Sequence, residues 1–172
     1  IAQAQYDSAN NMTDRFAALA ALENSHAAGK ADALKRFYDD FKEEALVIDK
    51  WFSLQAMART TDVNFVKTLM QHPAFTIKNP NRARSLIFSF CSGNPAAFHV
   101  PDGNGYMFWA DQVIALNALN PQVAARLARS LDRWRKYTPA LQAKMRLALQ
   151  RVADTPNLSR DVSEVITKAL AN

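Results

Sequence analysis

Glycine and cysteine are scarce in this chain of 172 residues, which has four glycines and a single cysteine, Cys91. Little glycine, with much Ala, Leu, Lys, Arg and Gln, favours helix over sheet. One cysteine excludes an internal disulfide and suits a reducing compartment. No apolar run approaches the ~20 residues of a membrane span, and no basic-then-apolar leader is visible. We therefore expect a helical, cytoplasmic protein without a membrane segment.

The motifs of common enzyme classes are also missing. The three histidines, His26, His72 and His99, lie far apart, and there is no HExxH, CxxC, Gly-rich phosphate loop or Gly-x-Ser-x-Gly elbow. Without a His or Cys cluster we expect no metal site in this chain. His99 and Asp102, beside a glycine-containing loop, could form a site, but a hydrogen bond that orders the loop is favoured. We expect neither a catalytic residue nor a cofactor here.

The bulk composition is that of an ordinary globular protein, with 49% apolar and 22% charged residues. The length suffices for one well-buried core, and no internal linker is visible, so residues 1–172 are predicted to form a single domain. Charge is uneven: residues 1–78 carry nine Lys/Arg and ten Asp/Glu, whereas residues 79–172 carry twelve and six. A basic half can bind nucleic acid, an acidic surface or carboxylate ligands, or can simply be solvated.

Apolar residues recur at helical spacing along the chain, and no stretch has the alternation of a strand. The predicted helices are residues 13–24, 30–43, 46–57, 62–72, 80–91, 106–119, 121–136 and 139–152, and a last one after Ser159. Short breaks between helices of this length predict antiparallel neighbours. The predicted fold is therefore all-α, an irregular superhelical stack of antiparallel helix pairs similar to HEAT or armadillo repeats. Cys91 lies on an apolar stripe, which indicates a packed thiol.

Three Asn-Pro pairs mark predicted helix starts: Asn79-Pro80, Asn94-Pro95 and Asn120-Pro121. An Asn side chain can accept a hydrogen bond from a free N–H of the first turn, and Pro at the first helical position loses no bond.

Arginines follow two of these starts. Gln122, Arg126, Arg129 and Arg133 recur at i, i+4, i+7 and i+11, as one polar stripe of the predicted helix 121–136. Arg84 lies at the edge of the apolar stripe of its own helix. A guanidinium is suited to a carboxylate or a peptide carbonyl because its donors are planar and always charged. Plain solvation is favoured for Arg129 and Arg133, while both interpretations stay open for Arg84 and Arg126.

Seven segments, in the same order, closely resemble the C-terminal domain of the bacterial aminopeptidase N family, and they span essentially the whole chain. They are NNMTDR (10–15), IDKWF (48–52), NPNRARSLI (79–87), NPAAFH (94–99), DGNGY (102–106), NPQVAARL (120–127) and ITKALA (166–171). One departure is Phe88-Ser89, where the family commonly has small residues.

The resemblance implies an all-helical C-terminal cap of a four-domain zinc aminopeptidase that removes N-terminal residues, typically small or basic ones, from peptides. The zinc site and its glutamate base would lie in an upstream catalytic domain of the same polypeptide, and this chain would hold no zinc. The helical domain would close a chamber for short peptides. Arg84, Gln122 and Arg126 match positions expected to face that chamber, where they would position substrate without bond chemistry.

Two rival functions fit the same sequence. The first is a helical-repeat interaction module that binds an acidic protein partner through its basic half. The second is a nucleic-acid binder, suggested by a pI of 9.5 and the arginine stripe. The resemblance favours the aminopeptidase, and with it short peptide substrates and no nucleic acid or membrane partner.

Overall fold

The computed structural model describes residues 1–171, and every regular element in that range is a helix. None of these helices has both the length and the apolar character needed to cross a membrane. The elements are α1 (Ala2–Ser8), α2 (Met12–Glu23), α3 (Lys30–Phe41), α4 (Ala45–Ala56), α5 (Val63–Leu69), α6 (Pro80–Ala83), η1 (Arg84–Phe88), α7 (Ser89–Gly93), α8 (Pro95–Phe98), α9 (Asn104–Leu119), α10 (Pro121–Ala128), η2 (Arg129–Leu131), η3 (Trp134–Lys136), α11 (Pro139–Ala153) and α12 (Arg160–Ala171).

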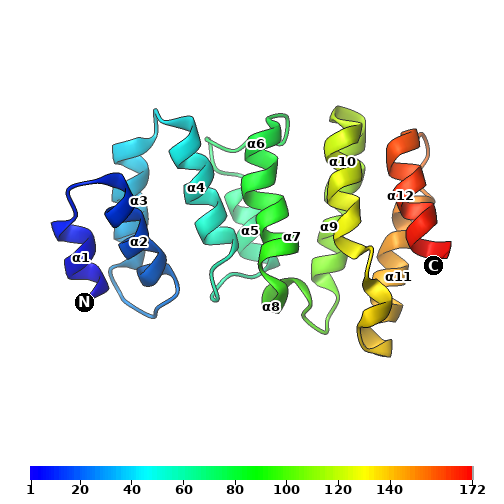
Figure 1. Ribbon diagram of the computed structural model, residues 1–172, viewed down its shortest axis with the longest axis horizontal. Coiled ribbons are helices and arrows are strands. Elements are labelled where there is room, and N and C mark those ends of the chain that lie inside the picture. Colours follow the sequence, from blue (N-terminus) through cyan, green and yellow to red (C-terminus); the bar gives the residue numbers. More distant parts are fainter. Residues whose placement is uncertain (172) are drawn as a thin grey trace.

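The helices stand side by side in two rows, and the chain termini lie at opposite ends of the long axis (Figure 1). Residues 80–93 form one continuous helix, the α6–α7 helix, which contains the π-helical segment η1. The front row in Figure 1 holds α2, α4, the α6–α7 helix, α10 and α12, and the fainter rear row holds α3, α5, α9 and α11. This arrangement confirms the predicted all-α stack of helix pairs.

All three Asn-Pro pairs start helices, as predicted. The side chains of Asn79, Asn94 and Asn120 each accept a hydrogen bond from a backbone N–H of the first turn, and Pro occupies the first helical position after each one. These are local interactions, which explains why the sequence alone places the three starts.

The buried apolar side chains form a core that is continuous along the stack. The predicted stripe of the α6–α7 helix is buried throughout, at Ala83, Leu86, Ile87, Phe90 and Cys91. Burial raises the pKa of the Cys91 thiol far above its usual value, so the thiolate is disfavoured. This environment confirms that Cys91 is a packed thiol.

The predicted helix 121–136 is wrong in its second half. The α-helix ends at Ala128 and continues as two short 3₁₀ segments, so no single α-helical stripe joins Gln122 to Arg133. The indole of Trp134 donates to the Ala169 carbonyl at 2.9 Å, and Arg135 donates to the same carbonyl at 2.7 Å. These bonds attach the second 3₁₀ segment to the end of α12, and they join residues that are far apart in sequence.

Helix α1 was not predicted. It has one large buried side chain, Tyr6, which is too little for a periodic pattern. The Tyr6 hydroxyl donates to the Ala33 carbonyl at 3.0 Å, and the guanidinium groups of Arg15 and Arg36 lie 5.8 and 5.2 Å from the centre of its ring. Tertiary contacts therefore hold α1 in place.

Candidate functional site

Gln122 and Arg126 lie one turn apart on α10, where the cap at Asn120 sets the direction of both side chains. Both are exposed, and both line a pocket of about 280 Å³ between α10 and α12. The other lining residues are Ala125, Arg129, Asp161, Glu164 and Val165. The structure thus brings together two of the three predicted chamber residues.

The two walls of this pocket carry opposite charges. Arg126 and Arg129 stand on one side, and Asp161 and Glu164 of α12 stand on the other. Within residues 1–171, no ion pair joins the walls, and the one pair made by a lining residue is Arg129–Asp132 at 3.9 Å. The donors of Arg126 therefore remain available to a ligand. Because the guanidinium of Arg126 is exposed to solvent, its attraction to a charged ligand stays weak until water is excluded.

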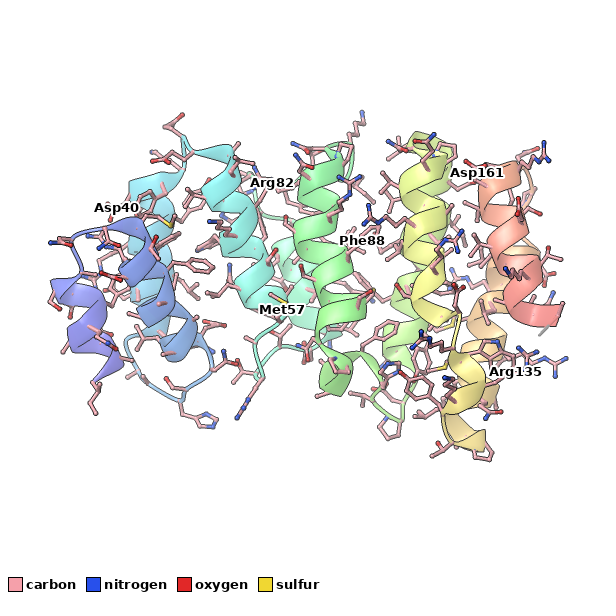
Figure 2. The ribbon with its side chains drawn as sticks, viewed as in Figure 1. Asp40, Met57, Arg82, Phe88, Arg135 and Asp161 are labelled. Carbon is pink, nitrogen blue, oxygen red and sulfur yellow. The ribbon has the colours of Figure 1, made fainter. Side chains whose placement is uncertain are left out.

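Arg84 does not line this pocket. It opens η1 on the neighbouring helix of the front row, is exposed, and donates from Nη1 to the Asn81 side chain at 3.3 Å. Phe88, about one turn further along, lies in the space between the α6–α7 helix and α10 (Figure 2). The departure Phe88-Ser89 falls at the end of the π segment that Arg84 opens.

Sequence reasoning missed three residues of the α12 wall, Asp161, Glu164 and Val165, and favoured plain solvation for Arg129. Asp161 and Glu164 are three residues apart, which places them on one face of α12. That spacing is readable from the sequence, but their meeting with α10 depends on tertiary packing, for which the sequence holds no local signal.

His99 and Asp102 do not form a catalytic pair. The Asp102 carboxylate accepts the Asn104 N–H at 2.8 Å and so orders its loop. His99 lies between two tyrosines instead, with Nδ1 2.9 Å from the Tyr106 hydroxyl and Nε2 3.0 Å from the Tyr137 hydroxyl. Burial lowers the pKa of His99 and raises the pKa of Tyr106 to about 12. The group joins the start of α9 to the segment before α11.

We expect the lowered pKa of His99 to make stability depend on pH. The folded state resists a proton that the unfolded state accepts near pH 6.5, so the free energy of unfolding falls as pH drops below about 6.5 toward the lower folded pKa. His99→Phe should show a flatter decline between about pH 7 and pH 5 in urea titrations. His72 acts in the same direction as His99, and Glu23, whose buried carboxyl has a raised pKa, acts in the opposite one. The contribution of His99 is therefore the difference in pH dependence between wild type and His99→Phe. If the free energy of unfolding changed with pH equally in both proteins, the lowered pKa of His99 would be contradicted.

Residues 1–171 offer no set of side chains suited to a zinc ion. Across residues 1–171, no three His, Cys, Asp or Glu side chains gather into a group that could hold a metal ion. Both ring nitrogens of His99 are already engaged by tyrosine hydroxyls.

Comparison with known proteins places the chain in a family. Residues 1–171 match the family described as "Domain of unknown function (DUF3458_C) ARM repeats". Aminopeptidase N of Escherichia coli (strain K12) is 48% identical over 97% of this chain, and that of Haemophilus influenzae is 43% identical over 99%. The crystal structure of Legionella pneumophila aminopeptidase A in complex with aspartic acid superposes with a TM-score of 0.92 at 34% identity and covers 99% of the chain.

The chain covers only about a fifth of each of these proteins: 19% of the Escherichia coli relative and 20% of the other two. The aligned region is the C-terminal part of aminopeptidase N. Family and fold agree, because armadillo-type repeats are stacked helices. The chain therefore belongs to the DUF3458_C family of ARM-repeat domains and corresponds to the C-terminal helical domain of bacterial aminopeptidase N.

Proposed function

We propose that residues 1–172 form one C-terminal domain of a cytoplasmic zinc aminopeptidase that removes N-terminal residues from peptides, and that this domain closes the peptide chamber of an upstream catalytic domain. The observation that carries the proposal is the match of nearly the whole chain to the C-terminal part of aminopeptidase N. The upstream domain of the same polypeptide supplies the zinc and the bond chemistry. The C-terminal domain closes the chamber and supplies peptide-binding groups.

Arg84, Gln122 and Arg126 anchor the peptide beyond its first residues. The guanidinium of Arg126 offers paired donors to a carboxylate or carbonyl, and the Gln122 amide both donates and accepts, as a peptide backbone requires. Neither has a partner within residues 1–171 that a peptide must displace. Closure over the catalytic domain excludes water, which strengthens these bonds and fixes the register of the peptide.

The charge pattern of the pocket supports a peptide over a nucleic acid. A phosphate backbone would meet the carboxylates of Asp161 and Glu164 opposite the arginines. A peptide carries groups of both signs and suits both walls. An acidic protein partner would meet the same repulsion at α12.

The test is Arg126→Ala in the full-length polypeptide that carries this chain. We expect KM for tetrapeptides to rise about 10-fold with kcat nearly unchanged, since a hydrogen bond to a charged group contributes about 1.5 kcal/mol. Dipeptides, which end before the anchor, should be unaffected. Arg133→Ala, an exposed arginine outside the pocket, is the matched control. Equal KM values for Arg126→Ala and wild type with tetrapeptides would contradict the anchoring role. In a separate binding assay, RNA or DNA binding that weakens with salt would favour the nucleic-acid alternative.

A further inference from the structure

Arg84 opens the one π-helical segment found within residues 1–171. The N–H of Ser89 donates to the Arg84 carbonyl, five residues earlier. In an α-helix the same N–H would bind the carbonyl of Ser85, four residues earlier. The Ser85 carbonyl has therefore lost its usual partner, although it lies in a buried part of the helix.

The spacing of the buried residues suits a helix with one wide turn. Buried pairs recur every four residues, at Arg82/Ala83, Leu86/Ile87 and Phe90/Cys91. In a regular α-helix each step of four residues turns the side chain about 40° past a full turn, so these pairs drift around the helix. One π turn absorbs this drift by adding a residue.

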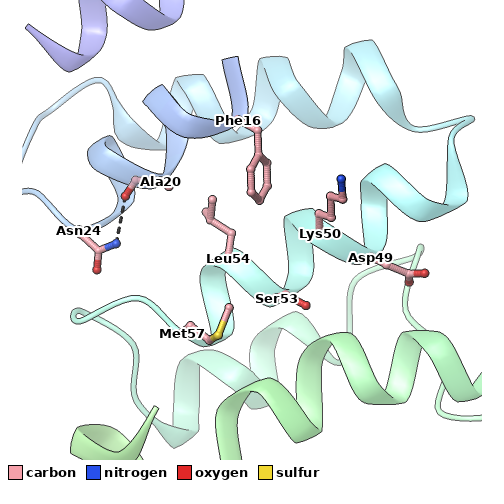
Figure 3. A pocket seen from close by; sticks show the side chains of 8 residues that line it. All are labelled: Phe16, Ala20, Asn24, Asp49, Lys50, Ser53, Leu54 and Met57. Carbon is pink, nitrogen blue, oxygen red and sulfur yellow. Dashed lines mark hydrogen bonds between the residues drawn. The ribbon is translucent and has the colours of Figure 1, made fainter. Parts of the chain in front are cut away.

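Ser53 of α4 replaces the lost partner. Its hydroxyl donates to the Ser85 carbonyl at 2.8 Å, and the Ser89 hydroxyl, which lies 3.4 Å from the Arg84 carbonyl, donates to Ser53 at 3.2 Å. One turn earlier on α4, Asp49 pairs with Arg82 at 3.0 Å. Figure 3 shows Asp49 and Ser53 following each other along α4. Helix α4 thus holds both the start and the wide turn of the α6–α7 helix.

The direction of Arg84 depends on this wide turn. Removing the extra residue of the π turn would rotate the preceding part of the helix by about 100° relative to Phe90 and Cys91. The wide turn therefore sets how Arg84 is oriented relative to the packed half of its helix. Ser53 touches no candidate peptide-binding residue directly and acts only through the backbone of Ser85.

We propose that Ser53 is a positioning residue: by bonding the free carbonyl of Ser85, it stabilises the π segment that directs Arg84 toward the peptide chamber. This inference rests on the proposed function. Loss of the hydroxyl leaves the buried carbonyl without a donor, so the segment shifts toward other geometries. The peptide contact of Arg84 then weakens, although Arg84 itself is unchanged.

The test uses Ser53→Ala, Ser53→Thr, Arg84→Ala and the double variant Ser53→Ala/Arg84→Ala, all in the full-length polypeptide. Ser53→Ala should raise KM for tetrapeptides about 3-fold to 5-fold without changing kcat or dipeptide turnover, because one neutral hydrogen bond contributes about 1 kcal/mol. Amide hydrogen exchange should become faster in residues 84–89. Ser53→Thr should restore both values: it keeps the hydroxyl, and Ser53 lines a groove of about 500 Å³ with room for a methyl group.

The double variant separates positioning from general stability. If Ser53 acts through Arg84, the double variant should have the KM of Arg84→Ala alone, whereas a merely structural effect would multiply the two changes. Multiplied effects, or an unchanged KM in Ser53→Ala while Arg84→Ala responds, would overturn the positioning role alone. An unchanged KM in Arg84→Ala would overturn the proposed anchoring by Arg84, and the positioning role with it.

Discussion

Trp109→Ala is expected to lower the free energy of unfolding by about 4 kcal/mol. Trp109 is fully buried on α9, and its indole N–H donates to the Leu127 carbonyl of α10 at 2.9 Å. The truncation leaves a cavity between the two helices and removes the donor from a buried carbonyl near the end of α10. Urea unfolding of the 172-residue chain, followed by circular dichroism, measures the loss.

Two further variants separate the contribution of the hydrogen bond from that of the buried ring and give a surface control. Trp109→Phe keeps most of the ring and removes the hydrogen bond, so it should cost about 1–2 kcal/mol. Met107→Ala, at an exposed side chain of the same helix, should change stability by less than about 1 kcal/mol. If Trp109→Ala were no more destabilising than Met107→Ala, the packing of α10 on α9 would not depend on the indole.

The Trp109 contact also matters for the candidate site. Gln122 and Arg126 point from the side of α10 that faces α12, while Trp109 binds α10 from α9, in the rear row. The position of the pocket wall therefore depends on packing behind it. A partial loosening of α10 should weaken peptide binding before the domain unfolds.

The sequence predicted those elements whose signals are local. The Asn-Pro pairs placed the starts of α6, α8 and α10 because the cap, the proline and the first turn lie within four residues. The apolar period placed most of the remaining helices, and the stripe ending at Cys91 was entirely buried. The predicted stack followed from helix lengths and short breaks.

The elements that sequence reasoning missed depend on distant partners. After Ala128 the α-helix that starts at Pro121 gives way to two 3₁₀ segments, and Trp134 and Arg135 of the second one bind the end of α12. The π segment from Arg84 depends on Ser53, more than thirty residues earlier in the chain. Neither partner can be identified before the helices are placed in space.

The candidate site was predictable only in part. Gln122 and Arg126 came from the family resemblance, and their spacing placed them on one face of α10, where the structure has them. Their role as peptide anchors stays a prediction. The acidic wall formed by Asp161 and Glu164 requires the pairing of α10 with α12, which follows from the packing of the whole stack.

Gly105→Ala is expected to be destabilising by about 3 kcal/mol, although alanine is the better helix former. Gly105 is buried in the first turn of α9, and a Cβ there would clash with the backbone oxygen of Phe98, at the end of α8. That oxygen belongs to the main chain and cannot move aside as a flexible side chain does. The first turn of α9 would have to shift away from α8, which disturbs the fully buried ring of Phe98.

Gly93→Ala is the matched control for this prediction. A Cβ at Gly93 would meet the Met57 sulfur at 2.9 Å, at the far end of a flexible and exposed side chain that can rotate away. Its cost should stay below about 1 kcal/mol. Thermal and urea unfolding of both variants at one pH give the comparison, and similar stabilities would mean that α8 and α9 can separate at little cost. A large difference would indicate that the close approach of the two helices fixes the start of α9, and through Trp109 the place of α10 and its arginines.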